Sequence, residues 1–144
     1  MNVEVFFDTN ILVYAAIGTA EEERKRERAL DLIESEDFGT SAQVLQEFYV
    51  TVTKKARRPF SALQASEWIE QWAEFPCQAI DRQLVQIAIE FSQRYAISYW
   101  DAAILAAAAA LGAHTVYSED LSDGQVYGPV RVVNPFVKGA PKYR

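Results

Sequence analysis

The sequence predicts an α/β fold in which helices cover both faces of a central parallel sheet of about five strands. Short runs rich in β-branched and aromatic residues alternate with longer segments of helical periodicity, as in parallel sheets covered on both faces. Gly and Pro residues separate several of these segments. The 144 residues are enough for one domain with a substantial core, so we expect a single domain over 1–144.

Five runs have the composition of strands. The first is Val-Glu-Val-Phe-Phe and ends at Asp8, and the others lie at 38–39, 77–80, 115–117 and 130–133. Ligand sites in open parallel sheets lie beyond the carboxyl ends of the strands. The acids that directly follow the first and fourth runs are therefore expected at the functional edge.

The helices of the first half are predicted from apolar spacing and capping residues. A short helix at 11–16 is followed by a highly charged helix at 20–35 with a narrow apolar stripe. The next helix starts near Thr40 or Ser41, because Thr40-x-x-Gln43 has the form of a capping box.

The helices of the second half follow from the same signals. Ser61-x-x-Gln64 repeats the capping pattern and opens a helix that Pro76 ends. Asp81 caps a helix whose apolar residues keep the i, i+3, i+4, i+7 spacing. The last helix runs from about 98 or 101 to 111, and its alanine-rich surface allows it to approach a sheet closely.

Composition excludes several classes of protein. No apolar run approaches the roughly 20 residues of a membrane span, and the N-terminus does not resemble a signal peptide. Cys77 is the only cysteine, which excludes an internal disulfide, so we expect a cytoplasmic protein. A single histidine excludes His-rich zinc sites. The net charge of -6 argues against binding nucleic acid by overall charge alone.

Two basic patches remain possible phosphate contacts. The first, within 24–28, is interleaved with glutamates and is interpreted as a solvated helix face. The second contains Lys54, Lys55, Arg57 and Arg58 without an acidic residue among them. A solvated helix end and an RNA-binding patch explain it equally well. The three tryptophans lie at core-like helical positions and are interpreted as packing residues.

Asp8 and Asp101 are the leading candidates for catalysis. Asp8 can be an ordinary helix N-cap, but it also lies at the functional edge of the sheet, which favours a catalytic role. Asp101 belongs to Ser98-x-x-Asp101, so a capping role and a catalytic role are equally supported by that motif. A helix start that points its acid toward a sheet-edge cleft favours function.

The other acids are less certain from their local pattern. Glu47 falls away from the apolar stripe of its helix, so periodicity alone indicates a surface residue. The loop after 115–117 offers Asp120 as the best further ligand and Asp123 as the next, although Asp123-Gly124 is equally a turn.

Clustered carboxylates are sufficient for hydrolysis when they hold a hard dication. Acids brought close together repel one another, and Mg²⁺ or Mn²⁺ relieves that repulsion through oxygen ligands. Such a metal lowers the pKa of a bound water and clamps a scissile phosphate. This chemistry requires neither histidine nor cysteine.

Four segments together resemble the motifs of PIN-domain nucleases, and in particular VapC-type toxins of toxin–antitoxin pairs. They are Phe6–Tyr14, Ser41–Tyr49, Tyr99–Ile104 and Ser118–Leu121, and they span nearly the whole chain. The resemblance implies a three-layer α/β fold, Mg²⁺- or Mn²⁺-dependent cleavage of RNA, a cognate antitoxin and a homodimer. It carries the metal-binding and catalytic roles to four acids, Asp8, Glu47, Asp101 and Asp120.

The resemblance also assigns supporting residues and leaves alternatives open. Thr9 and Asn10 match the first motif and are expected to position Asp8 or a metal-bound water. At the fourth position many relatives have an acid–any–acid–Phe pattern, whereas this chain has Glu119-Asp120-Leu121, so Asp123 stays the alternative ligand. A catalytically inactive PIN-like interaction protein is the main rival. Phosphatases of the haloacid dehalogenase type are disfavoured because Asn10 replaces their second aspartate.

Overall fold

The structure, a computed structural model, describes residues 2–18 and 22–137. Within these residues, six strands form one sheet in the order β3-β2-β1-β4-β6-β5. The strands are β1 (Val5–Phe7), β2 (Phe38–Ser41), β3 (Cys77–Gln78), β4 (Thr115–Tyr117), β5 (Val126–Tyr127) and β6 (Val130–Val133). All neighbouring pairs are parallel except β5 and β6. The predicted α/β class is therefore confirmed, and β5 is an added antiparallel edge strand.

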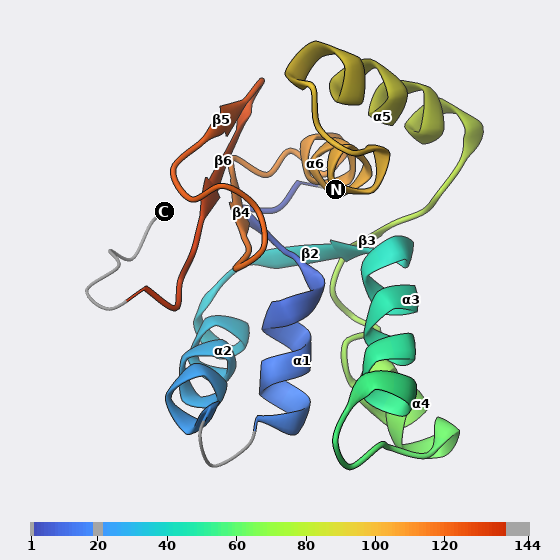
Figure 1. Cartoon of the computed structure of the whole chain (residues 1–144), viewed down its shortest axis with the longest axis vertical. Helices are drawn as coiled ribbons and strands as arrows, with labels where there is room; N and C mark the ends of the chain where they lie inside the picture. The colour runs from blue at the N-terminus through green and yellow to red at the C-terminus, as the bar shows by residue number, and fades with distance from the viewer. Residues whose placement is uncertain (1, 19–21, 138–144) are drawn as a thin grey trace.

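Helices lie on both sides of this sheet, which makes three layers (Figure 1). On one side are α1 (Thr9–Ile17), α2 (Glu23–Ser35), α3 (Ala42–Val50) and α4 (Ala62–Gln71), and on the other are α5 (Arg82–Tyr95) and α6 (Tyr99–Ala110). α3 continues directly into η2 (Thr51–Lys55), a short π-helix. No helix in the described part of the chain is long and apolar enough to cross a membrane.

The predicted capping residues begin their helices at Ser61, Asp81 and Ser98, but not at Thr40. Ser61 and Gln64 form both bonds of a capping box, and Asp81 and Ser98 accept hydrogen bonds from the third residue of their helices, as predicted. The predicted Thr40–Gln43 box is wrong: Thr40 belongs to β2, and the Ser41 hydroxyl accepts from the Val44 amide. The strand extends farther than its composition indicated, so the cap moves by one residue.

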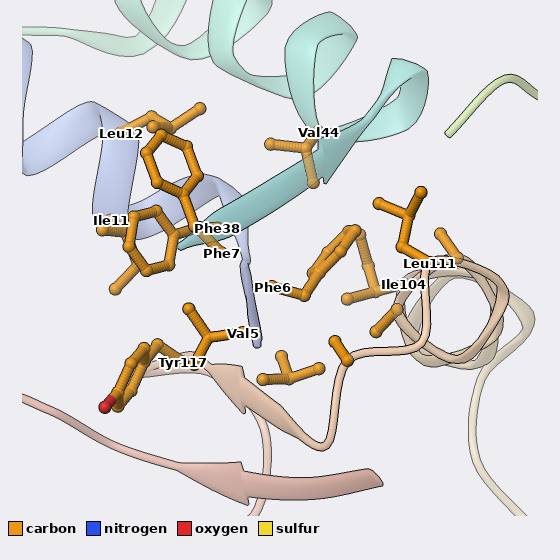
Figure 2. Close-up of a cluster of buried hydrophobic side chains, with 14 of the residues drawn as sticks. Val5, Phe6, Phe7, Ile11, Leu12, Phe38, Val44, Ile104, Leu111 and Tyr117 are labelled. Carbon is orange, nitrogen blue, oxygen red and sulfur yellow. The ribbon is translucent and has the colours of Figure 1, made fainter. Parts of the chain in front are cut away.

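The core forms on both faces of β1. Figure 2 shows Phe6 directed toward Ile104 and Leu111 on the α6 side, whereas Phe7 lies with Phe38 and Ile11 on the opposite side. Phe7 and Phe38 stack with their ring centroids 4.3 Å apart. Alternate residues of a strand point to opposite faces, so a strand that is apolar at successive positions is buried on both sides.

The alanines of α6 allow this helix to lie close to the sheet. Residues 102–108 are all buried, and five of these seven are alanine. α5 packs on the outer side of α6 (Figure 1). This confirms the expected close approach of an alanine-rich helix.

Candidate active site

Asp8 occupies the carboxyl edge of the sheet between two strands. Phe7 of β1 pairs with Tyr117 of β4, so the next residues, Asp8 and Ser118, become neighbours although they are 110 positions apart. The Asp8 side chain accepts hydrogen bonds from the Thr9 amide (2.7 Å) and the Ser118 hydroxyl (2.7 Å). Asp8 is both the N-cap of α1 and a buried acid at the predicted edge.

The Asp8 carboxyl has unusual electrostatics. Burial raises its pKa from the usual 3.8 to about 6, while the hydrogen bonds from Ser118 and Thr9 oppose this increase. The negative charges of Glu47 and Asp120 raise the pKa of Asp8 further. Glu47 and Asp120 therefore lie close enough to Asp8 for their charges to act on its carboxyl.

Asp120 is held beside Asp8 by the first residues of α1. The Asn10 amide donates a 3.2 Å hydrogen bond to Asp120 Oδ2, and the Asn10 carbonyl oxygen accepts from the Glu119 amide at 3.2 Å. The Ser118 hydroxyl oxygen accepts from the Asp120 amide at 3.1 Å. Asn10 thus orients Asp120 rather than contacting Asp8.

Asp123 lies apart from this arrangement. Its Oδ1 accepts a 2.8 Å hydrogen bond from the Asn134 amide, which ties the exposed loop before β5 to the end of β6. Of the two predicted alternatives for the fourth acid, the structure brings Asp120 to the site and gives Asp123 a loop contact.

Glu47 faces the site from α3. The Thr9 hydroxyl donates to Glu47 Oε1 at 2.8 Å, and the Gln43 amide donates to Glu47 Oε2 at 3.2 Å. The surface position indicated by periodicity is wrong. The side of α3 that carries Glu47 meets α1, and the apolar pattern of α3 alone gives no sign of that contact.

Asp101 lies in the first turn of α6, where the Ser98 hydroxyl oxygen caps its amide at 3.1 Å. Gln43 Nε2, which donates to Glu47, also donates to the Trp100 carbonyl at 3.2 Å. This bridge links the start of α6 to Glu47, but the Asp101 side chain itself is exposed. Among the described residues, no three Asp, Glu, His or Cys side chains are close enough to hold a metal ion in the observed arrangement.

An open groove of about 1490 Å³ lies beside Glu47 and Asp120. Its lining includes Thr9, Asn10, Glu47 and Asp120 together with Lys55, Arg57 and Arg58. Its volume exceeds the roughly 300–1,000 Å³ of ordinary small-molecule pockets. Lys54 is exposed but does not line the groove. Three of the four residues in the predicted RNA-binding patch therefore line the same groove as Glu47 and Asp120.

The π-helix at the end of α3 places the basic residues in this groove. The Ala56 amide donates to the Thr51 carbonyl, and the Phe60 amide donates back to the Val52 carbonyl at 2.8 Å. The chain turns back over η2, and residues 55–58 come to the groove. π-Helical turns occur frequently at functional sites.

The first basic patch is only partly the solvated face that its charge pattern indicated: Arg26 pairs with Glu23 at the surface, but its neighbours make tertiary contacts. Arg24 and Arg28 donate to the carbonyls of Phe136 and Pro135, at 3.0 and 3.2 Å. Lys25 forms an ion pair with Glu119. These tertiary contacts involve segments more than 90 residues away and leave no trace in the local pattern.

Several contributors to the site did not stand out in the sequence. Ser118 and Gln43 hold Asp8 and Glu47, yet neither type of residue is distinctive in isolation. Ser118 directly follows a predicted strand, and Gln43 precedes Glu47 by four positions, so position relative to an acid was the available signal. Trp100 is 66% exposed, so its interpretation as a packing residue is wrong, whereas Trp72 is buried at 7%.

Comparison with known proteins agrees with this geometry. Residues 5–122 match the PIN domain family, which is most of the chain. The chain belongs to the PIN domain family. No curated protein matches it significantly.

Solved structures of PIN-domain chains share the fold at low sequence identity. A toxin–antitoxin complex from Klebsiella pneumoniae has a TM-score of 0.67 and 21% identity, covering 92% of this chain and 98% of the other. A VapC toxin from Mycobacterium tuberculosis, described as cleaving the sarcin–ricin loop, has a TM-score of 0.64 and 22% identity over 81% and 90%. DNA-bound VapBC from Salmonella typhimurium has a TM-score of 0.61 and 17% identity over 90% and 96%. At such identities the likeness establishes the fold.

Proposed function

We propose that this PIN-domain chain is a divalent-metal-dependent ribonuclease that hydrolyses phosphodiester bonds in RNA. The observation that carries the proposal is the groove that contains both Glu47 and Asp120, the neighbours of Asp8, and the cations Lys55, Arg57 and Arg58. The cations attract a phosphate backbone, and the acids lie where that backbone would be cut.

The donors fit Mg²⁺ or Mn²⁺ by their chemistry. Hard dications prefer carboxylate oxygens, and mutual repulsion among Asp8, Glu47 and Asp120 is the condition that a cation relieves. We assign metal binding to these three acids together with Asp101. Once bound, the metal supplies a water of lowered pKa and a positive charge against the scissile phosphate.

The remaining groups orient the acids and the substrate. Ser118 and the Thr9 amide hold Asp8, the Thr9 hydroxyl and Gln43 hold Glu47, and Asn10 holds Asp120. Lys55, Arg57 and Arg58 are proposed to contact phosphates along the groove, and the exposed Lys54, next to Lys55 in sequence, is proposed to add a further phosphate contact.

We further propose that residues 1–144 act as one domain and as the toxin of a type II toxin–antitoxin pair. The support is the shared fold with solved VapC and VapBC proteins, among them toxin–antitoxin complexes. A cognate antitoxin is then the expected protein partner, and a homodimer is expected from the family resemblance.

The alternative is a PIN-domain protein that binds partners without catalysis. The spacing of the acids favours this alternative, since no three of them in the described residues form a ready ligand set. A metal titration of RNA cleavage with wild type and Asp8→Asn in parallel separates the two proposals. We expect Mg²⁺- or Mn²⁺-dependent cleavage only by wild type, with unchanged circular dichroism in the variant.

Two further outcomes would contradict the ribonuclease proposal. One is wild-type protein that is folded but cuts no RNA at any metal concentration. The other is retained cleavage by a folded Asp8→Asn, Asp101→Asn double variant, which would point to a contaminating nuclease or a different site.

A further inference from the structure

We propose that Lys25, Glu119 and Tyr14 form a positioning cluster that holds the segment Ser118–Asp120 and so keeps Asp120 beside Asn10 and Asp8, where it can contribute to metal binding. This inference rests on the proposed metal-dependent function. None of the three residues is proposed to touch metal or RNA. Their role is to act through Asp120.

The cluster joins three separate parts of the chain. Lys25 of α2 is paired with Glu119 Oε2 and donates to the Tyr14 hydroxyl oxygen at 3.1 Å. The Tyr14 hydroxyl of α1 donates a hydrogen bond to Glu119 Oε1 at 2.6 Å. Both oxygens of the Glu119 carboxylate are therefore occupied by side chains from α1 and α2.

Two aromatic rings, those of Tyr14 and Phe136, pack against the Lys25 ammonium group. Lys25 Nζ lies 4.9 Å from the ring centroid of Tyr14 and 5.8 Å from that of Phe136, and these two rings are in edge contact at 5.0 Å. Phe136 is buried, and Arg24 and Arg28 hold the carbonyls of Phe136 and Pro135. These contacts restrict the Lys25 side chain to a position beside Glu119 and Tyr14.

Glu119 is connected to Asp120 both as its neighbour in the chain and through the side chain of Asn10. The Glu119 amide donates to Asn10 Oδ1, and Asn10 in turn donates to Asp120 Oδ2. The Ser118 hydroxyl binds Asp8 and accepts from the Asp120 amide. Glu119 therefore fixes one side of the segment while Asp8 and Asn10 fix the other.

The partial burial of the ion pair makes its loss consequential. The side chains of Lys25 and Glu119 are only 30% and 25% exposed. Without Lys25, the Glu119 carboxylate would lack its cation in a partly desolvated position and would turn toward water. The adjacent Asp120 would then lose its orientation.

A substitution at Lys25 distinguishes positioning from simple electrostatics because the two predict opposite signs. If only Coulomb forces acted, removing a positive charge near a cation site would reduce repulsion and strengthen cation binding. Loss of positioning weakens binding instead, and outer-shell partners of metal ligands typically change metal affinity by about 10–100-fold.

The test is Mn²⁺ affinity measured on the full chain by calorimetry and by electron paramagnetic resonance. We expect Lys25→Met to bind Mn²⁺ about 10-fold more weakly than wild type. The matched control is Arg26→Met, which removes an equal charge from α2 at a residue that pairs with Glu23 on the surface. The control should keep wild-type affinity.

Tyr14→Phe is the second variant, because it retains the ring contact with Phe136 and removes only the hydroxyl. We expect its Mn²⁺ affinity to fall about 5-fold, the equivalent of one ordinary hydrogen bond of about 1 kcal/mol. Metal-free thermal unfolding identifies any Lys25→Met protein that fails to fold, in which case Tyr14→Phe decides.

The outcomes separate this inference from the proposed function. Unchanged or tighter Mn²⁺ binding by folded Lys25→Met, or unchanged binding by Tyr14→Phe, overturns the positioning cluster while the ribonuclease proposal stands. Wild-type protein that binds no Mn²⁺ overturns both. Weaker binding in both variants, with the control unchanged, supports the cluster.

Discussion

The Thr9 hydroxyl donates a 2.8 Å hydrogen bond to Glu47, which joins the first turn of α1 to the middle of α3. The amide of the same residue binds Asp8. Thr9 thus contacts two of the candidate ligands at once, one through its backbone and one through its side chain. Any change at its hydroxyl affects Glu47 without altering the bond to Asp8.

Thr9→Val therefore tests the contribution of Glu47 orientation. The substitution nearly preserves volume but removes the donor, and we expect kcat/KM for metal-dependent RNA cleavage to fall about 10-fold or more. Thr9→Ser retains the hydroxyl and should keep most of the activity. Retained activity in Thr9→Val with a loss in Thr9→Ser would show that methyl packing matters at this position instead of the hydrogen bond.

Asp8 should make the metal-free protein less stable as pH rises. Its pKa is about 6 in the folded protein against a usual 3.8, so folding favours the protonated form. The associated stability is complete below pH 3.8 and is lost as pH rises through 6, a difference of about 3 kcal/mol. Asp8→Asn removes this penalty and should be more stable than wild type at pH 7.

Urea unfolding with a chelator present measures this effect. The stability advantage of Asp8→Asn over wild type should grow by about 1 kcal/mol between pH 5 and pH 7. Saturating Mg²⁺ should reduce the advantage, since the cation favours ionised Asp8. An advantage that is independent of pH would contradict the raised pKa.

Asp101 and Asp123 should differ sharply in their effect on cleavage. We expect Asp101→Asn to abolish metal-dependent RNA hydrolysis with its helix intact, because the Ser98 cap binds the backbone amide. Asp123→Asn should leave hydrolysis close to wild type, since the Asp123 carboxylate accepts a loop hydrogen bond from the Asn134 amide, apart from the other acids. Single-turnover cleavage rates for the two purified variants decide between them, and a reversed order would transfer the ligand role to Asp123.

The basic residues of the groove should determine the salt dependence of RNA binding. Replacing Arg57 and Arg58 with Gln should weaken binding and flatten the slope of log K against log salt by about 1.4 for single-stranded RNA. The comparison is a double Gln variant of Arg82 and Arg94 on α5, which changes net charge equally on the other side of the sheet (Figure 1). Identical slopes in the two double variants would remove the phosphate-contact proposal. Fluorescence anisotropy in catalytically inactive Asp8→Asn provides the measurement.

Local signals in the sequence were sufficient for most of the fold. The caps at Ser61, Asp81 and Ser98 lie where predicted, because a capping hydrogen bond spans only a few residues. β5 was missed since it comprises only Val126 and Tyr127 and is formed by pairing with β6. Such a short strand has no periodicity of its own.

The residues of the candidate site were harder to predict from local sequence patterns than the fold was. Asp8 could be inferred from its place after a strand, but Glu47 needed the motif resemblance, because its partners Thr9 and Gln43 lie on two different helices. Lys25 shows the same limit: its glutamate neighbours in sequence indicated a solvated face, whereas Glu119 lies 94 residues away. Alternation of charge describes a helix in isolation and not the surface against which it packs.

The sheet order also has a consequence for the timing of synthesis. β1 and β4 are adjacent in the sheet, yet the residues that directly follow them, Asp8 and Ser118, are 110 positions apart in the chain. A nascent polypeptide that ends before Tyr117 lacks both Ser118 and Asp120, so its Asp8 has neither partner. The proposed cutting activity can therefore arise only after the ribosome has made the segment Ser118–Asp120, and a shorter nascent chain lacks it.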